Sequence, residues 1–324
     1  MRAVVYDTYG PPDVLRIEDV ARPEPKDGEI RVKVHAVAVT RGDCATRDAN
    51  RNSGPAISLL SRAISGLSRP KQRILGSEFS GTVDAIGPGV VDFKPGDEIF
   101  GSTGFRFGAY AEYLVVPESA RITTKPSNLS FEEAAAITDG GFYALIPLRA
   151  ANVKPGARVL VYGASGAIGT AGVQLAKNYG ADVTAVTETK NVELVRSLGA
   201  DRVIDYTTDD FTRNSKTYDV IFDAVGKLQF GRVQGSLNEH GRFLPTDGLG
   251  NFVRALTMSR FEDKKVVFQL PPRITKDDAV LLKELVEAGK FKAVVDRTYP
   301  LERVVEAHRY VETERKVGNV ILVL

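Results

Sequence analysis

The chain has 324 residues, of which 43% are hydrophobic, and it carries a formal net charge of +2 at pH 7. This length predicts about two domains, and the small net charge gives no indication of a nucleic-acid partner. A single cysteine, Cys44, excludes an internal disulfide and a cysteine-rich zinc site.

The start of the chain has the pattern of a β-strand and not that of a signal peptide, because residues 1–6 are mostly apolar and a Gly-Pro-Pro turn follows. No apolar run approaches the ~20 residues that a membrane-spanning helix needs. We therefore expect a cytoplasmic protein without stable insertion into a membrane.

Residues 1 to about 122 contain short strand-like runs that are separated by turn residues. Clear examples are 30–37, 81–87 and 111–116. This spacing is typical of a barrel-like β domain.

Residues 44–73 have no clear pattern and are rich in basic side chains. They hold one acid, Asp48, against the bases Arg47, Arg51, Arg62, Arg69, Lys71 and Arg73. Within them, 57–67 has the pattern of a short amphipathic helix. We interpret the segment first as a solvated surface excursion. The alternatives are an active-site lid, a contact with an acidic or apolar partner, and a peripheral membrane contact.

From about residue 128 the pattern changes to alternating helices and strands. A helix is predicted over 131–138, with Ser130 as N-cap and Glu132 and Glu133 in its first turn. Strands are predicted at 158–162, 182–186, 202–204, 218–223, 241–244 and 265–268. Such alternation predicts a doubly wound parallel sheet.

The C-terminal segment, 299–324, combines a predicted helix at 301–311 with an apolar strand at 319–324. We expect this segment to return to the first domain. The predicted limits are therefore 1–122 with 296–324 for the first domain and 123–295 for the second.

The most informative stretch is the turn between the strand at 158–162 and the helix that follows it. Its pattern is Ala-x-Gly-x-x-Gly, in which Ala164 takes the place of the first glycine of the dinucleotide fingerprint. Glycines let a pyrophosphate approach the backbone, and the N–H groups at a helix start attract its charge. The expected cofactor-binding residues are Gly163, Ala164, Ser165, Gly166, Ala167, Ile168 and Gly169.

Several further motifs follow one another along the chain. They are LGSEFSGTV at 75–83, GPGV at 87–90, PGDEI at 95–99, GAYAEY at 108–113, LGAD at 198–201, VIDY at 203–206 and FDAVG at 222–226. In this order, over essentially its full length, the chain resembles the medium-chain dehydrogenase/reductase superfamily, and within it the zinc-independent quinone oxidoreductase-like branch. The resemblance implies an α/β protein with a GroES-like β-barrel domain, a Rossmann domain with a doubly wound parallel sheet, and a cleft between them.

The resemblance also bears on metal binding. Zinc-containing relatives carry Cys, His and Glu ligands and a four-cysteine lobe, which this chain lacks. The position of the usual catalytic cysteine falls near Thr40, and the remaining Glu78 is one carboxylate, too few for a tetrahedral site. We therefore expect no metal and a structural role for Glu78.

Cofactor selectivity is expected just after the second Rossmann strand, where NAD enzymes place an acid. Thr187 stands at that position here, and Thr189 and Lys190 follow it. The branch uses this pattern to bind NADPH, often with a tyrosine that matches Tyr206. Glu188 could repel a 2′-phosphate, or it could pair with a neighbouring base. The resemblance thus implies NADPH as the cofactor.

Because no metal is expected, fewer classes of reaction remain. Hydride delivery to an already activated acceptor needs no Lewis acid, so the acceptor is expected to be a quinone or the C=C bond of an α,β-unsaturated carbonyl. These are also the typical activities of the branch. The alternative is an NADPH sensor or structural protein that kept the fold and lost turnover.

Three residues are catalytic candidates. Thr40 and Asp43 match the segment beside the nicotinamide in relatives, although Asp43 could instead form a structural ion pair. Tyr143 replaces a threonine near the cofactor, and could donate a proton to the acceptor oxygen, narrow the pocket or pack at the domain interface. The expected pocket residues are Phe105, Phe107, Tyr110 and Asp139.

Two further segments follow later strands of the predicted sheet. Val225 and Gly226 are expected at the cofactor, because ligands bind at the carboxyl edge of such a sheet. Residues 265–268 resemble the outer strand through which relatives pair their Rossmann sheets. We therefore expect a homodimer, although a covered edge strand would give the same pattern.

Overall fold

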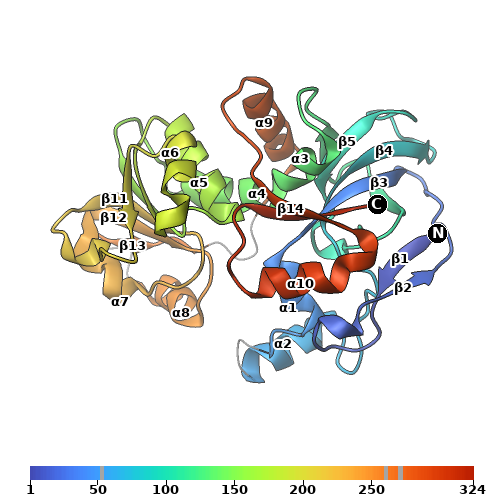
Figure 1. Cartoon of the computed structure of the whole chain (residues 1–324), viewed down its shortest axis with the longest axis horizontal. Coiled ribbons are helices and arrows are strands. Elements are labelled where there is room, and N and C mark those ends of the chain that lie inside the picture. The colour runs from blue at the N-terminus through green and yellow to red at the C-terminus, as the bar shows by residue number, and fades with distance from the viewer. Residues whose placement is uncertain (52–54, 259–261, 269–272) are drawn as a thin grey trace. The chain divides into compact units, whose positions relative to one another are not determined.

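The computed structural model describes residues 1–51, 55–258, 262–268 and 273–324. The chain divides into two compact units, each with its own sheet (Figure 1). The first unit comprises Met1–Thr138, Thr275–Glu287 and Ala293–Leu324, and the second comprises Asp139–Ile274 and Ala288–Lys292. None of the described helices is long and apolar enough to cross a membrane.

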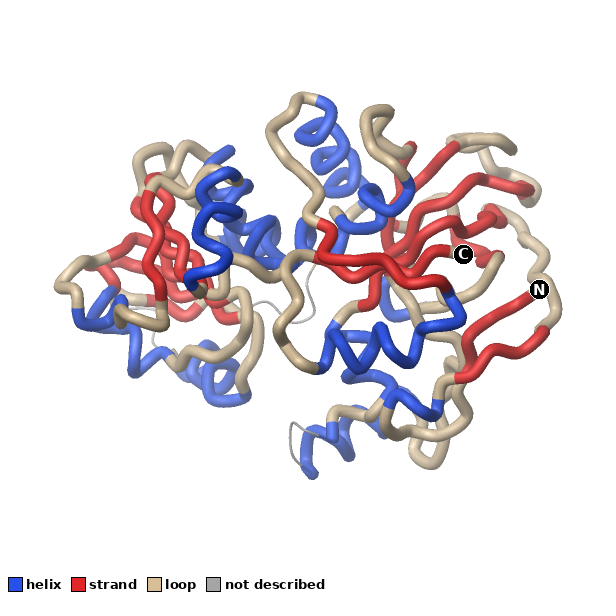
Figure 2. Tube along the Cα trace, viewed as in Figure 1, coloured by secondary structure: helices blue, strands red, loops and turns tan. Residues whose placement is uncertain are grey.

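The first unit is built on a seven-stranded sheet (Figure 2). Its hydrogen-bonded order is β14-β15-β3-β4-β5-β7, and β6 also pairs with β3. The strands are β3 (Glu29–Val39), β4 (Glu78–Ile86), β5 (Glu98–Ser102), β6 (Tyr113–Pro117), β7 (Arg121–Thr124), β14 (Val295–Pro300) and β15 (Asn319–Val323). A separate two-stranded sheet joins β1 (Arg2–Val5) to β2 (Arg16–Asp19). The predicted β domain is thus confirmed.

The alternation of side chains along β3 explains where the core of this unit lies. Ile30 and Val32 are fully buried, whereas Lys33 between the strand's buried positions is exposed, because successive side chains point to opposite faces. Leu322 of β15 joins the same apolar core. Since β15 pairs with β3, the end of the chain returns to the first unit as predicted.

Helices pack around this sheet. Those described are α1 (Arg41–Arg47), α2 (Pro55–Ser65), α3 (Phe131–Ala136), α9 (Lys276–Glu287) and α10 (Val304–Glu312). The predicted N-cap of α3 is confirmed, because Glu133 N–H donates to Ser130 Oγ at 3.2 Å and Ser130 N–H donates to the Glu133 carboxylate at 2.9 Å. Ala135 of α3 then packs with Ala36 of β3.

The limits of the two units differ from the predicted 1–122 with 296–324 and 123–295. The helix α3 lies in the first unit, on β3. The helix α9 is bound there too, because Lys283 Nζ donates to Thr124 Oγ1 at 2.6 Å and Asn128 Nδ2 donates to Val286 O at 3.2 Å. The predicted limits follow the point in the sequence where strands are replaced by helices. That point is not where the chain passes from one compact unit to the other.

The second unit is built on a parallel sheet of six strands in the order β10-β9-β8-β11-β12-β13. The strands are β8 (Arg158–Tyr162), β9 (Asp182–Thr187), β10 (Arg202–Asp205), β11 (Tyr218–Asp223), β12 (Leu237–Pro245) and β13 (Lys265–Val266). Its described helices are α4 (Thr138–Ala150), α5 (Ala167–Asn178), α6 (Val192–Ser197), α7 (Phe230–Val233) and α8 (Leu249–Thr257).

This order confirms the predicted doubly wound sheet. The chain moves outward from β8 through β9 to β10, and then returns to place β11 on the other side of β8. The carboxyl ends of β8 and β11 therefore meet at a topological switch point, where ligands of such sheets bind. The predicted bounds of β8 and β11 are confirmed, whereas β13 is shorter than the predicted 265–268.

Candidate active site

The turn after β8 is shaped by glycines. The N–H groups of Gly163 and Ala164 both donate to Val186 O, at 3.1 and 3.0 Å, which ties the turn to β9. A Cβ on Gly163 would lie 2.5 Å from Val225 Cγ1, and a Cβ on Gly169 would lie 2.1 Å from Gly163 O. Because both distances are below van der Waals contact, this close packing of strand, helix and loop requires glycine.

The helix α5 begins with an open N-terminus. Its N-cap is Gly166, which has no side chain to satisfy the first N–H groups. A Cβ on Gly166 would meet only Gly163 O, at 3.8 Å. No N-cap side chain therefore bonds the first N–H groups of α5, from Ala167 onward, and helix starts of this kind commonly bind anionic groups. Ser165 and Ile168 lie in the same turn and first helical turn.

The first turn of α4 packs against the start of α5. A Cβ on Gly140 would lie 2.2 Å from Ala167 O, so glycine is required for this approach as well. Asp139 and Tyr143 are four residues apart on α4, a spacing that places them on one side of the helix. Tyr143 is partly exposed. The structure thus brings this phenol onto an element that adjoins the glycine turn.

The end of β9 carries residues predicted to select the cofactor. Thr187 is buried, and within the described part of the chain its hydroxyl has no hydrogen-bond partner. Lys190 Nζ lies 2.8 Å from Glu188 Oε1. Of the two roles considered for Glu188, the structure shows the ion pair with a neighbouring base. The Lys190 ammonium, which is expected to bind the 2′-phosphate, is therefore already paired with the Glu188 carboxylate.

The strand β10 ends beside β9 and adds an acid that was not among the predicted site residues. Thr189 Oγ1 donates to one oxygen of Asp205, and the N–H and hydroxyl of Thr207 donate to the other. These bonds hold the pKa of Asp205 below its ordinary value. Tyr206 is exposed, and its N–H donates to Thr187 O at 3.0 Å. The predicted selectivity residues therefore share one edge of the sheet.

A second acid outside the prediction is Asp223, the last residue of β11. Its buried carboxylate accepts the N–H groups of Val225 at 3.2 Å and of Leu228 at 2.7 Å, and two further N–H groups of the same turn bond to it. Burial raises the pKa of Asp223 to about 6, although the N–H bonds oppose this shift. The carboxylate holds Val225 in its contact with Gly163. The sequence signal that could have identified Asp223 is an acid directly at the end of an apolar strand.

In the first unit, Thr40 and Asp43 form the capping box of α1. The N–H and hydroxyl of Thr40 donate to Asp43 Oδ2 at 2.9 and 2.8 Å, and Asp43 N–H donates to Thr40 Oγ1 at 3.0 Å. Gly76 N–H donates to Asp43 Oδ1 at 3.1 Å. Both side chains are buried. The structure thus brings the two residues together, with the hydroxyl proton of Thr40 directed at Asp43.

A chain of buried side chains continues from Asp43. The Tyr110 hydroxyl bonds to the Asp43 carboxylate, and His308 Nε2 lies 3.2 Å from the same hydroxyl. The guanidinium of Arg47, which is 1% exposed, lies 3.0 Å from His308 Nδ1. Since a guanidinium only donates, Nδ1 accepts and Nε2 carries the proton of a neutral imidazole. Burial and the Arg47 charge lower the pKa of His308 to about 3.

The predicted pocket residues differ in their surroundings, and one needs correction. Tyr110 is fully buried and its ring packs edge-on to His308, so it offers no surface to a ligand. Phe105 is exposed and lies in the 3₁₀ turn Gly104–Arg106. Phe107 is half-buried and follows this turn directly. Phe107 has a φ of +52°, an unusual conformation for a phenylalanine. Asp139 lies on α4.

The possible metal donors of the first unit have other partners. Cys44 Sγ lies 3.3 Å from His308 Nδ1, and burial raises the pKa of the thiol. Glu78 Oε1 accepts from Ser102 Oγ at 2.8 Å. Among the residues that the structure describes, no group of three or more His, Cys, Asp and Glu side chains could hold a metal ion. The described donors therefore do not fit a tetrahedral zinc site.

Two family models match the chain. The alcohol dehydrogenase GroES-like domain matches residues 26–127. The zinc-binding dehydrogenase model matches residues 198–322. The two matches follow the order of the sequence motifs, from the β domain to the second unit and the C-terminal segment.

Named relatives cover nearly the whole chain. It is 32% identical, over 99% of its length and 79% of the relative, to an NADPH-dependent alkenal/one oxidoreductase of Arabidopsis thaliana. It is 30% identical, over 100% of its length and 98% of the relative, to a quinone oxidoreductase of Homo sapiens. The solved quinone oxidoreductase of Coxiella burnetii superimposes with a TM-score of 0.87 at 28% identity, covering 100% of this chain and 99% of that one. The chain belongs to the medium-chain dehydrogenase/reductase superfamily, in its quinone oxidoreductase-like branch.

Proposed function

We propose that the protein is a zinc-independent, NADPH-dependent reductase that transfers a hydride to a quinone or to the C=C bond of an α,β-unsaturated carbonyl. The observation that carries this proposal is the glycine turn at the start of α5, which has no N-cap side-chain bond and lies at the switch point of a parallel sheet. The names of the relatives support both classes of acceptor. The other engagements of Cys44 and Glu78 support a reaction without zinc.

In this proposal the second unit holds the cofactor. The pyrophosphate binds at the residues 163–169 and the first N–H groups of α5. The 2′-phosphate is taken up at the ends of β9 and β10 by Thr187, Thr189, Lys190 and Tyr206. Val225 and Gly226 border the cofactor at the end of β11. Lys190 supports the preference for NADPH over NADH, and its pairing with Glu188 moderates that preference.

The bound nicotinamide supplies the hydride, and the protein orients the acceptor and stabilises the charge that develops on its oxygen. Tyr143 is our candidate for donating a proton or a hydrogen bond to that oxygen. Thr40 and Asp43 are proposed as positioning residues, because the Thr40 hydroxyl already donates its proton to Asp43. Phe105 and Phe107 are proposed as apolar contacts of the acceptor.

The first test is the oxidation of NADPH, and separately of NADH, followed at the nicotinamide absorbance band with a panel of quinones and enones. We expect faster turnover with NADPH on at least one acceptor class, and no loss of activity after treatment with a metal chelator. NADPH binding without oxidation of any acceptor would instead favour the NADPH sensor or structural protein.

A variant of the candidate proton donor sharpens this test. Tyr143→Phe should lower kcat by roughly ten- to a hundredfold while the Kd for NADPH is unchanged, because only the hydroxyl is lost. Tyr113→Phe on β6 is the matched control and should keep full turnover. An unchanged kcat in Tyr143→Phe would remove this residue as donor and leave the reductase proposal standing.

We also propose a cytoplasmic homodimer formed through the edge of the second sheet. The strand β13 pairs with β12 at one end of the described order, and an open strand edge is a site of association. Beside it, α8 exposes Leu249, Val253 and Leu256, next to a surface pocket of about 480 Å³. The mass in solution should be that of two chains, and Leu256→Glu should reduce it to that of one. Cell fractionation tests the location.

A further inference from the structure

The helix α2 turns apolar side chains outward. Leu59 and Leu67 are 65% and 67% exposed, and Ala63 midway between them is exposed as well. Leu59 and Ala63 are spaced by four, so they lie on one side of α2, and Leu67 follows in the turn after the helix. We call these three residues the α2 surface. Figure 1 shows α2 at the margin of the first unit.

The polar side of the same helix holds it on the β domain. Asn50 Nδ2 donates to Ser61 Oγ at 2.9 Å, and the Arg62 guanidinium lies over the Tyr9 ring at 5.2 Å. The Tyr9 hydroxyl donates to Gly66 O at 2.8 Å, just after the helix. An ordinary surface helix packs its apolar face inward. Here the polar residues make the described contacts with the domain, and the described apolar residues point to solvent.

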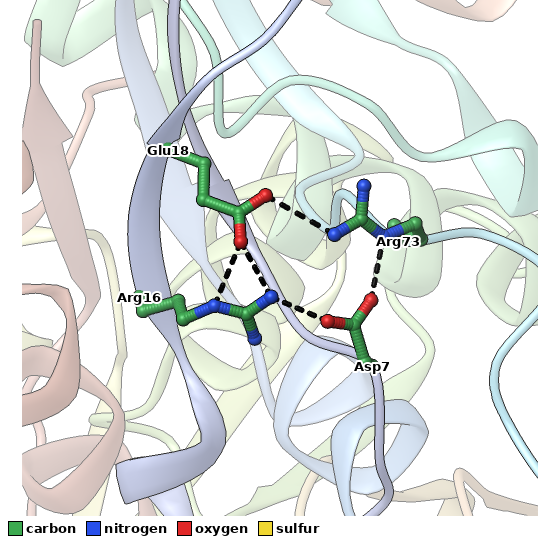
Figure 3. A network of polar contacts seen from close by, with 4 residues as sticks. All are labelled: Asp7, Arg16, Glu18 and Arg73. Carbon is green, nitrogen blue, oxygen red and sulfur yellow. Dashed lines mark hydrogen bonds and ion pairs between the residues drawn. The ribbon is translucent and has the colours of Figure 1, made fainter.

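The end of the segment 44–73 is fixed by a closed ring of charged side chains (Figure 3). Arg73 donates to Asp7 at 2.6 Å and to Glu18 at 3.1 Å, and Arg16 bonds to the same two acids. The backbone agrees, because Tyr6 N–H donates to Arg73 O at 3.0 Å. The segment is therefore held at several points along its length, and α2 is presented as a fixed element.

The charge of the segment has one sign. Between Asp48 and Glu78 the sequence contains no acid. It contains five bases, which are Arg51, Arg62, Arg69, Lys71 and Arg73. Arg51, Arg69 and Lys71 are exposed, whereas Arg73 is neutralised in the ring. Exposed leucines are thus accompanied by exposed positive charge.

We propose that the α2 surface docks on an anionic lipid membrane. Leucines on one side of a helix enter the boundary between headgroups and acyl chains, and neighbouring Arg and Lys are attracted by anionic headgroups. The basic residues favour this occupant over a second copy of the chain, because two copies of the surface would bring like charges together. The proposal is independent of the reductase reaction.

The test is co-sedimentation of the full chain with phosphatidylcholine vesicles that contain about one third phosphatidylglycerol. We expect binding that weakens as salt is raised and that falls at least about fivefold in the variant Leu59→Ser with Leu67→Ser. The matched control is Ile86→Ser with Val91→Ser, because these apolar residues of the first unit are 38% and 83% exposed and lie outside the proposed dimer edge. The control should bind vesicles as the unmodified chain does.

A charge variant tests the second half of the proposal. Arg69→Gln should weaken binding to the anionic vesicles, whereas Arg213→Gln, an exposed arginine of the second unit, should not. Equal binding to pure phosphatidylcholine, no binding, or equal losses in the α2 variant and the Ile86 and Val91 control would overturn the proposal. A mass in vesicle-free solution that falls in the α2 variant alone would identify a second copy as the occupant, and would overturn it too.

Discussion

The turn after β8 and the cluster around Asp43 use polar groups in opposite ways. In the turn, glycines remove side chains, and no N-cap side chain bonds the N–H groups at the start of α5. Around Asp43, each oxygen of the carboxylate accepts bonds from buried groups of the same unit. Both regions hold predicted site residues, but the Asp43 carboxylate is already occupied by groups of its own unit, whereas no N-cap side chain bonds the first N–H groups of α5. A predicted site position is thus a weaker indication of ligand contact than a donor that no internal side chain bonds.

The largest expected effect breaks the cluster. Arg47→Leu should lower the free energy of unfolding by about 4 kcal/mol, because it removes the buried guanidinium that bonds His308 Nδ1, Gly10 O and the Glu312 carboxylate. Urea unfolding measures this change. Arg309→Leu is the control, since its ion pair with Asp13 is exposed and should contribute less than about 1 kcal/mol. Equal effects of the two variants would show that the cluster is not a structural support.

The next effect concerns the acid that supports the turn from β11. The pKa of Asp223 rises from 3.8 to about 6 on folding, so the folded state binds more protons between these pH values. The contribution of Asp223 to stability therefore grows as the pH falls from about 6 to 4, by up to about 3 kcal/mol. The free energy of unfolding of the unmodified chain minus that of Asp223→Asn should therefore rise as the pH falls across this range. A fall in this signed difference would contradict the assignment.

The glycine turn itself is tested by one methyl group. Gly169→Ala would place a Cβ 2.1 Å from Gly163 O, and the backbone must shift to relieve this contact. We expect a loss of about 2 kcal/mol in stability and at least about a tenfold loss in NADPH affinity. The control is Gly235→Ala, where a Cβ meets no atom within 4 Å. Calorimetry of NADPH binding and thermal unfolding measure both effects, and an unchanged affinity would mean that NADPH binds elsewhere.

The smallest effect concerns the choice of cofactor. Glu188→Gln should release Lys190 and raise the preference for NADPH over NADH by about threefold, a small change because the pair is partly exposed. The Kd for NADH divided by the Kd for NADPH measures this preference. Glu193→Gln is the control, because its partner is Arg196 in α6. A lower ratio in Glu188→Gln would show that Glu188 assists the binding of NADPH.

The parts of the molecule that could be predicted from the sequence are those set by local pattern. The strand, turn and helix around Gly163 and the capping box of Ser130 follow from residues close together in the chain, and the structure confirms them. The burial of Arg47 could not be predicted, because its partners His308 and Glu312 lie more than 250 residues away. An arginine in a basic stretch gave no sign that it would be neutralised in a core.

The same reasoning applies to the candidate site. The sequence placed Thr187 and Lys190 after a strand, and the structure brings them to one edge with Tyr206. The pairing of Lys190 with Glu188 depends on how the backbone turns after β9, and the sequence left two alternatives open. Tyr110 was expected as an apolar wall of the pocket, because its segment matches one that faces the cleft in relatives. It is buried because His308 and Asp43 satisfy its hydroxyl.

The position of β15 has a consequence for synthesis on the ribosome. This strand lies between β14 and β3, so the sheet of the first unit lacks an interior strand until Asn319–Val323 emerge. Most of the second unit is one continuous segment, Asp139–Ile274, which emerges earlier. The nascent chain is therefore expected to fold the second unit before it completes the first unit. Until β15 emerges, one edge of β3 remains unpaired.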